Sequence, residues 1–276
     1  LSGPVLPTLA ALAAPGLVLA IVQTAVSIAD THFVGRLGTE ALAGLALVFP
    51  LVMLLQMTSA GAMGGGVSSA VARALGAGNA AGARRLVVHA LVIALCAGCV
   101  FTLLLVGFGR GLYALLGGRG GALAQALAYS DIVFSGAVLV WLGNTLASVL
   151  RGSGNTLAPA AIWVAAGAAQ IPLSWALTLG HGPFPALGIA GAAVAYVAAA
   201  ALASAAMGAS QGAGKVVWPV LAGTARLATV LAGGWLAATV LGSLSGVFAA
   251  IALGLALFGT VTIAAVHRTA WGRPGA

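Results

Sequence analysis

The chain has 276 residues, of which 62% are hydrophobic and only 5% are charged. Because a soluble domain carries roughly 25% charged residues, this composition excludes a water-facing globular protein and indicates a surface that lies in lipid. The formal net charge of +8 comes from basic residues spread thinly between apolar segments, which is typical of membrane topology signals and argues against nucleic acid as a partner.

Eight apolar segments are long enough to cross a bilayer as helices, for which about 20 residues suffice. Lipid offers no hydrogen bonds, and the apolar runs are continuous rather than alternating, so helices are favoured over barrel strands. In chain order the segments cover residues 9–34, 41–63, 86–108, 122–149, 157–179, 187–207, 216–240 and 244–266. Residues 64–75 are expected to extend the second helix past the bilayer, and the first segment is expected to anchor the chain without a removable signal peptide. The sequence predicts an all-α, polytopic membrane bundle.

Basic residues divide unequally between the loops on the two sides of the predicted bundle. With the N-terminus inside, the inner loops and tail hold Arg73, Arg84, Arg85, Arg151, Lys215, Arg268 and Arg273, and the outer loops hold Arg36, Arg110 and Arg119. The positive-inside bias then predicts a multi-pass protein of the cell inner (plasma) membrane with both termini in the cytoplasm. Arg226 lies within the seventh segment, where it either extends toward the headgroups or pairs inside the bundle.

Several short patterns in the sequence resemble motifs of soluble enzymes, but each lacks residues, a spacing or a sequence context that the motif requires. The string GASQGAGKVV resembles a phosphate-binding loop, but Val216 occupies the position that requires Ser or Thr. The four histidines have no spacing that places two on one helical face, so no metal site is predicted. Cys96 and Cys99 form a C-A-G-C pattern inside an apolar segment, and we interpret them as small apolar residues rather than a redox pair. The sequence predicts neither an enzyme nor a bound cofactor.

Asp30 is the most informative polar residue, because the chain has only three acids and this one lies in the apolar run IVQTAVSIADTHFVGRLG. A carboxylate at membrane depth costs about 2.5–3.5 kcal/mol on insertion scales, so such an acid usually binds a proton or cation or lies against a partner. Gln23 lies seven residues earlier, two turns away on the same helical face. Asp30 could carry a proton, could hold a sodium ion, or could be a structural hydrogen-bonding group near the membrane surface.

Four further polar side chains are candidates for lining a cleft: Asn144, Gln170, Ser174 and Tyr196. Gln170 and Ser174 are four residues apart and therefore share a helical face. Such amides and hydroxyls also join helices without any part in transport, and that alternative stays open. Asp131 is expected near the outer end of the fourth segment.

Four stretches resemble the multidrug and toxic compound extrusion (MATE) family, in family order: ADTHFVGRLGTEALAGLALVFP, VSSAVARALGAGNAAGARRLVVHAL, LRGSGNTLAP and FPALGIAGAAVAYV. The resemblance covers residues 1 to about 207. It implies two six-helix bundles around a central cleft that exchange organic cations for sodium ions or protons. It also implies that Asp30 matches the first-helix acid of the N-terminal lobe, while Gln170 and Ser174 occupy positions that hold Asn and Asp in many members.

The resemblance further implies that residues 1–207 form the six-helix N-terminal lobe, and that residues 208–276 form the last two helices of the C-terminal lobe and a cytoplasmic tail, with four helices absent between them. The function it implies is a secondary active antiporter that exports drug-like organic cations in exchange for protons or sodium ions, with Asp30 as the coupling acid. Two alternatives stay open: a truncated fragment that does not transport, and a half-transporter that acts as a homodimer.

Overall fold

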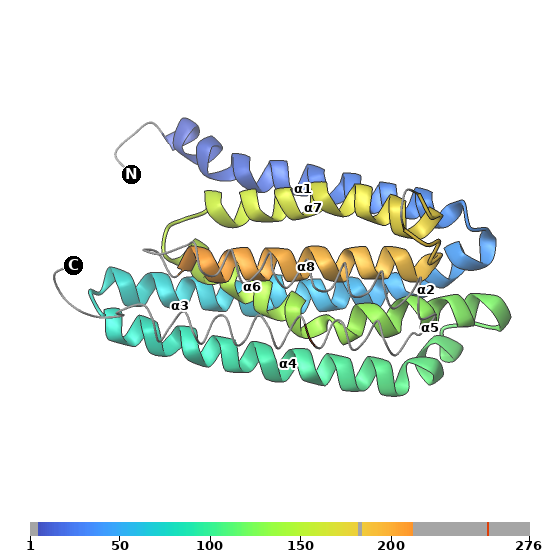
Figure 1. Cartoon of the computed structure of the whole chain (residues 1–276). Coiled ribbons are helices and arrows are strands. Elements are labelled where there is room, and N and C mark those ends of the chain that lie inside the picture. The colour runs from blue at the N-terminus through green and yellow to red at the C-terminus, as the bar shows by residue number, and fades with distance from the viewer. Residues whose placement is uncertain (1–4, 182–183, 212–252, 254–276) are drawn as a thin grey trace. The chain divides into compact units, whose positions relative to one another are not determined.

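The structure is a computed structural model that describes residues 5–181, 184–211 and 253 (Figure 1). These residues are helical apart from short connections, and no strand occurs among them. The helices are α1 (Val5–Gly35), α2 (Thr39–Gln56), η1 (Met57–Met63), α3 (Gly64–Gly76), α4 (Ala80–Leu115), α5 (Gly120–Ser135), α6 (Ala137–Gly152), α7 (Leu157–Leu179) and α8 (Ile189–Gln211). The predicted segments 216–240 and 244–266 lie outside the described residues, apart from residue 253, as do Lys215, Arg226, Arg268 and Arg273.

Five stretches of the described chain are long and apolar enough to cross a membrane: Ala14–Gly35, Thr39–Gly76, Ala80–Leu115, Leu157–Leu179 and Ile189–Ala209. The bent pair formed by α5 and α6 makes a sixth candidate span. Their order and positions agree with the six segments predicted between residues 9 and 207, and Thr39–Gly76 includes the expected extension of the second helix. The prediction of an all-helical, polytopic membrane fold is confirmed.

The fourth predicted segment, residues 122–149, is wrong as a single continuous helix. The structure has two helices, α5 and α6, that meet at an angle of 48° at Gly136. Ser135 donates its hydroxyl to the carbonyl of Asp131, and a Ser–Gly pair of this kind is a usual cause of a helix kink. A Cβ atom on Gly136 would lie 2.7 Å from the Val197 side chain, so α8 packs directly against the bend.

Asp131 lies in the second half of α5, 11 residues after its start, and its side chain is exposed. Its expected position near the outer end of the fourth segment stays a prediction.

The second span changes its helical geometry in the middle. Residues Met57–Met63 form a π-helix between α2 and α3. At its start the hydroxyls of Thr58 and Ser59 donate to the carbonyls of Leu54 and Leu55 at 2.7 and 2.6 Å. Hydroxyl groups that occupy backbone acceptors loosen the regular α-helical ladder, and π-helical turns are found frequently at functional sites.

Small residues allow the helices to approach closely. A Cβ atom on Gly98 of α4 would lie 2.6 Å from the Cα of Val138 in α6, and one on Gly44 of α2 would lie 2.8 Å from the backbone nitrogen of Ala126 in α5. Backbones that touch in this way recover van der Waals contact that lipid cannot provide as a driving force. Glycine at these two positions therefore fixes the packing of α4 on α6 and of α2 on α5.

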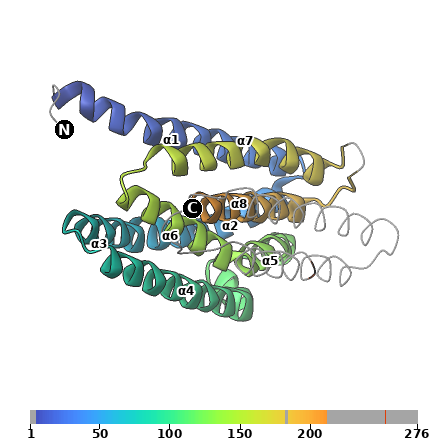
Figure 2. The same cartoon turned by 60° about the vertical axis from the view of Figure 1, so that its left-hand side comes forward.

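The helix α1 runs alongside α7 in both views (Figures 1 and 2). Val22 and Val26 of α1 face Gly167 of α7, where a Cβ atom would lie 3.0 Å from the Val22 side chain. This pairing brings together residues about 140 positions apart in the chain and sets the position of Asp30 against α7.

Candidate functional site

The Asp30 carboxylate joins α1 to α7 through two hydrogen bonds. Gln170 donates its Nε2 to Asp30 Oδ2 at 2.9 Å, and Ser174 donates its Oγ to Asp30 Oδ1 at 2.6 Å. Both donors are buried, with Ser174 fully inaccessible. The structure therefore brings three of the predicted site residues into one group, which we call the acidic group.

The acidic group contains one acid and two neutral donors. Amide and hydroxyl groups orient a carboxylate without cancelling its charge. Tyr129 is a buried aromatic residue of α5 that belongs to the hydrophobic core together with Val133 and Phe134.

A second polar cluster, the amide group, consists of Gln56, Ser59, Asn144 and Tyr196. Asn144 donates its Nδ2 to Gln56 Oε1 at 3.0 Å and to Ser59 Oγ at 2.8 Å. Gln56 in turn donates its Nε2 to the hydroxyl of Tyr196 at 2.9 Å. These contacts link α2 and the π-helix to α6 and α8.

The remaining predicted residues divide between this group and the protein surface. Asn144 and Tyr196 belong to the amide group, but Gln23 is exposed on α1 and makes none of the bonds in either group. Sequence analysis missed Gln56 and Ser59. Both are polar residues within the apolar run LVMLLQMTSA, and that position in the sequence could have identified them as candidates.

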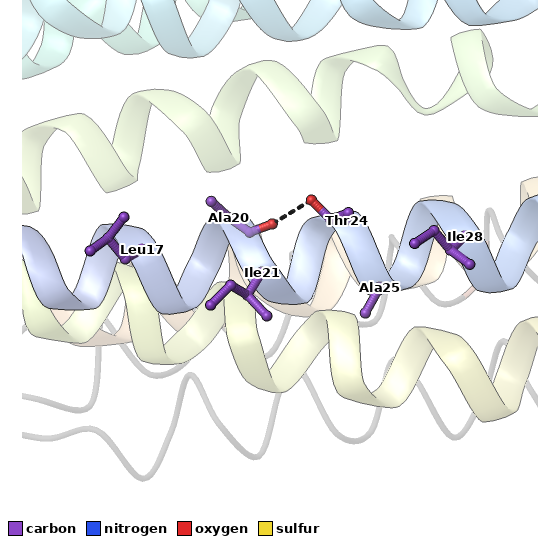
Figure 3. A pocket seen from close by; sticks show the side chains of 6 residues that line it. All are labelled: Leu17, Ala20, Ile21, Thr24, Ala25 and Ile28. Atoms are coloured by element: carbon purple, nitrogen blue, oxygen red, sulfur yellow. Dashed lines mark hydrogen bonds between the residues drawn. The ribbon is translucent and has the colours of Figure 1, made fainter.

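The face of α1 opposite Asp30 carries an apolar hollow (Figure 3). It is lined by Leu17, Ala20, Ile21, Thr24, Ala25 and Ile28, and the Thr24 hydroxyl already donates to the Ala20 carbonyl at 2.9 Å. With no free polar group on this face, the hollow is not the candidate site. The polar chemistry of α1 lies on the side that faces α7.

The acidic group offers oxygen atoms to a cation. The two carboxylate oxygens of Asp30, the Ser174 hydroxyl and the amide oxygen of Gln170 are the kinds of ligand that hard cations prefer. Among the described residues no three His, Cys, Asp or Glu side chains lie together in a way that could hold a metal ion. The chemistry of a single carboxylate with two neutral neighbours allows it to accept a proton or a cation.

A family model and two sequence relatives of this chain are all transporters or members of a transporter family. The MatE family model matches residues 15–176. The chain is 34% identical over 198 residues to a protein named FAD transporter from Shewanella oneidensis, a match that covers 71% of this chain and 43% of that protein. It is 28% identical over 193 residues to the probable multidrug resistance protein NorM of Thermotoga maritima, covering 67% of this chain and 40% of that protein.

A solved structure of a MOP superfamily transporter from Pyrococcus furiosus has a similar fold, with a TM-score of 0.68 and 24% sequence identity, over 93% of this chain and 63% of that one. The chain spans less than half the length of the two named relatives. Since the family model covers more than half of the chain, and the fold agrees with it, this protein belongs to the MatE family.

Proposed function

We propose that this protein is a secondary active antiporter that exports drug-like organic cations in exchange for protons or sodium ions, with Asp30 as the coupling acid. The observation that carries the proposal is the pair of bonds from Gln170 and Ser174 to the two oxygens of one intramembrane carboxylate. Membership of the MatE family and the multidrug resistance name of the Thermotoga maritima relative support export of drug-like compounds.

Occupation of Asp30 by an ion would change the contact between α1 and α7. An ionised carboxylate accepts hydrogen bonds on both oxygens, whereas a protonated one carries a donor on one of them. A sodium ion would compete with Gln170 and Ser174 for the same oxygens. In either case the state of the acid favours one arrangement of α1 on α7, which is how an ion gradient can drive alternating access.

We also propose that the end of the bundle that carries Arg73, Arg84, Arg85 and Arg151 faces the cytoplasm, in the inner membrane of the cell. The connections at Arg36 and Arg119 lie at the opposite end (Figure 1). A larger number of basic residues at one end supports this orientation.

The test is transport by the full chain in proteoliposomes. Vesicles loaded with a cationic dye and given a proton or sodium gradient should release the dye faster than vesicles without a gradient. Asp30→Asn should abolish the gradient-dependent part, while Asp131→Asn, which changes an exposed acid outside both groups, should retain it. Equal gradient-driven release from the wild type and Asp30→Asn would remove Asp30 from the mechanism.

A second candidate substrate is a flavin nucleotide, because the relative with 34% identity is named an FAD transporter. The same vesicles, loaded with FAD instead of the dye, separate the two substrates. Gradient-driven release of FAD without release of the dye would favour the flavin nucleotide over organic cations.

A further inference from the structure

We propose that a groove between α3 and α4 binds an anionic phospholipid, with an acyl chain along the groove and the headgroup phosphate between Arg73 and Arg85. This site lies on different helices from Asp30 and does not depend on the proposed transport function.

The groove is an open cavity of about 280 Å³ between the end of the π-helix, α3 and α4. Its walls are mainly small or branched apolar side chains: Ala62, Gly66, Val67, Ala70, Ala90 and Ile93. His89 is the polar residue that lines it, and its Nδ1 is bonded to the carbonyl of Arg85 at 2.7 Å. The lining of the groove is apolar, and its volume accepts part of a hydrocarbon chain.

Two arginines lie at the end of the groove nearest the turn between α3 and α4. Arg73 is three residues beyond Ala70, and Arg85 is four residues before His89, so both continue the groove-lining faces of their helices toward that turn. Both side chains are exposed, and Arg73 donates to the hydroxyl of Ser69 at 3.2 Å. Each guanidinium can bind a phosphate oxygen through parallel N–H groups.

No Asp or Glu side chain of α3 or α4 balances the charge at this end. The three acids of the chain are Asp30, Glu40 and Asp131, and none lies on α3 or α4. Basic pockets between transmembrane helices bind anionic headgroups in this way, and an adjoining apolar groove selects a lipid over a free anion.

Native mass spectrometry of the purified full chain in detergent, titrated with phosphatidylglycerol or phosphatidylcholine, tests the proposal. The wild type should bind phosphatidylglycerol more tightly. Arg73→Ala and Arg85→Ala should each weaken that binding about fivefold, the effect of roughly 1 kcal/mol per basic residue near anionic lipid. Arg119→Ala, at the other end of the bundle, should not change it.

Two glycines supply a matched test of the groove itself. A Cβ atom on Gly66 or on Gly65 meets nothing within 4 Å, so a larger side chain fits at either position, but only Gly66 lines the groove. Gly66→Leu should fill the groove and weaken phosphatidylglycerol binding at least fivefold, whereas Gly65→Leu should leave it unchanged.

Three outcomes would overturn the proposal. They are equal binding of the two lipids by the wild type, equal binding by Gly66→Leu and Gly65→Leu, and displacement of phosphatidylglycerol by millimolar inorganic phosphate. The last two would show an anion held at the surface by charge alone. Since the lipid comparison and the phosphate competition use the wild type, they decide the question even if a variant does not fold.

Discussion

The hydrogen bond between Asp30 and Ser174 predicts a measurable energetic coupling between α1 and α7. The perturbations are Asp30→Leu, which keeps the size of the side chain and removes both acceptors, Ser174→Ala, and the two together. A double-mutant cycle built from these variants isolates the energy of the pair, since the loss of the bond to Gln170 is common to both sides of the cycle.

The expected magnitude follows from the chemistry of the bond. Polar contacts between transmembrane helices average about 0.6 kcal/mol and reach about 1.7 kcal/mol, whereas hydrogen bonds to charged groups are worth about 1.5–3 kcal/mol. The distance of 2.6 Å from Ser174 Oγ to Asp30 Oδ1 is in the range of bonds from a hydroxyl to an ionised carboxylate. We expect a coupling of about 1.5 kcal/mol where the carboxylate is ionised, at the high end of the pH range. It should fall to about 0.6 kcal/mol at low pH, because protonation removes the charge that strengthens the bond.

The assay is equilibrium unfolding of the full chain in mixed micelles by SDS, followed by circular dichroism at several pH values. The matched control is a cycle between Asp30→Leu and Ser135→Ala, because the Ser135 hydroxyl bonds to the Asp131 carbonyl of its own helix. The stability effects of substitutions at distant, independent sites add to within about 0.3–0.5 kcal/mol. If the Asp30–Ser174 coupling stays within that margin of the control at every pH, the two side chains do not hold α1 to α7.

Three further changes test the packing of the bundle, each by SDS unfolding. Gly98→Ala should lower stability by about 1–3 kcal/mol, because its Cβ would lie 2.6 Å from the Cα of Val138; Gly107→Ala on the same helix, with nothing within 4 Å, should not, and equal effects would contradict the close contact. Asn144→Leu should cost about 1–2 kcal/mol through the loss of its bonds to Gln56 and Ser59, and an unchanged stability would mean that the amide group does not hold these helices together. Gly180→Ala should cost about 1–2 kcal/mol, because Gly180 ends α7 with φ of +73° and lies against Ala186, whereas Gly76→Ala, in open space, is the control that should be tolerated.

The sequence predicts the spans well because lipid imposes a simple rule: each crossing must be a long apolar helix. It does not predict the bend at Gly136 or the π-helix at Met57–Met63, because both preserve the apolar pattern and depend on a few hydroxyl bonds and on the packing of α8. Hydropathy identifies where a helix crosses the bilayer, while its local geometry is set by contacts that the pattern does not contain.

The candidate site also contains residues that the sequence predicts and residues that only the structure identifies. Asp30 is predicted from the energetic cost of a carboxylate in lipid, and Gln170 and Ser174 are predicted as polar candidates that share a helical face. The contact of these two residues with Asp30 is a finding of the structure. Gln56 and Ser59 are missed because they meet Asn144 across 88 and 85 residues of chain. Amides and hydroxyls are common in membrane helices, so neither residue type carries a signal as strong as that of an acid.

The two polar groups differ in how an ion would affect them. The amide group is neutral, and its contacts join α2 and the π-helix to α6 and α8 without any group that titrates near neutrality. The acidic group joins α1 to α7 through a carboxylate whose acceptors change when it takes up a proton or a cation. In the proposed antiport cycle, ion binding at Asp30 would therefore act on the pairing of α1 with α7. The amide group would keep α2, the π-helix, α6 and α8 in one arrangement. This division requires that only one of the two groups titrates. If the amide group also carried an ionisable side chain, ion binding would weaken the contacts among α2, the π-helix, α6 and α8 as well as the contact between α1 and α7.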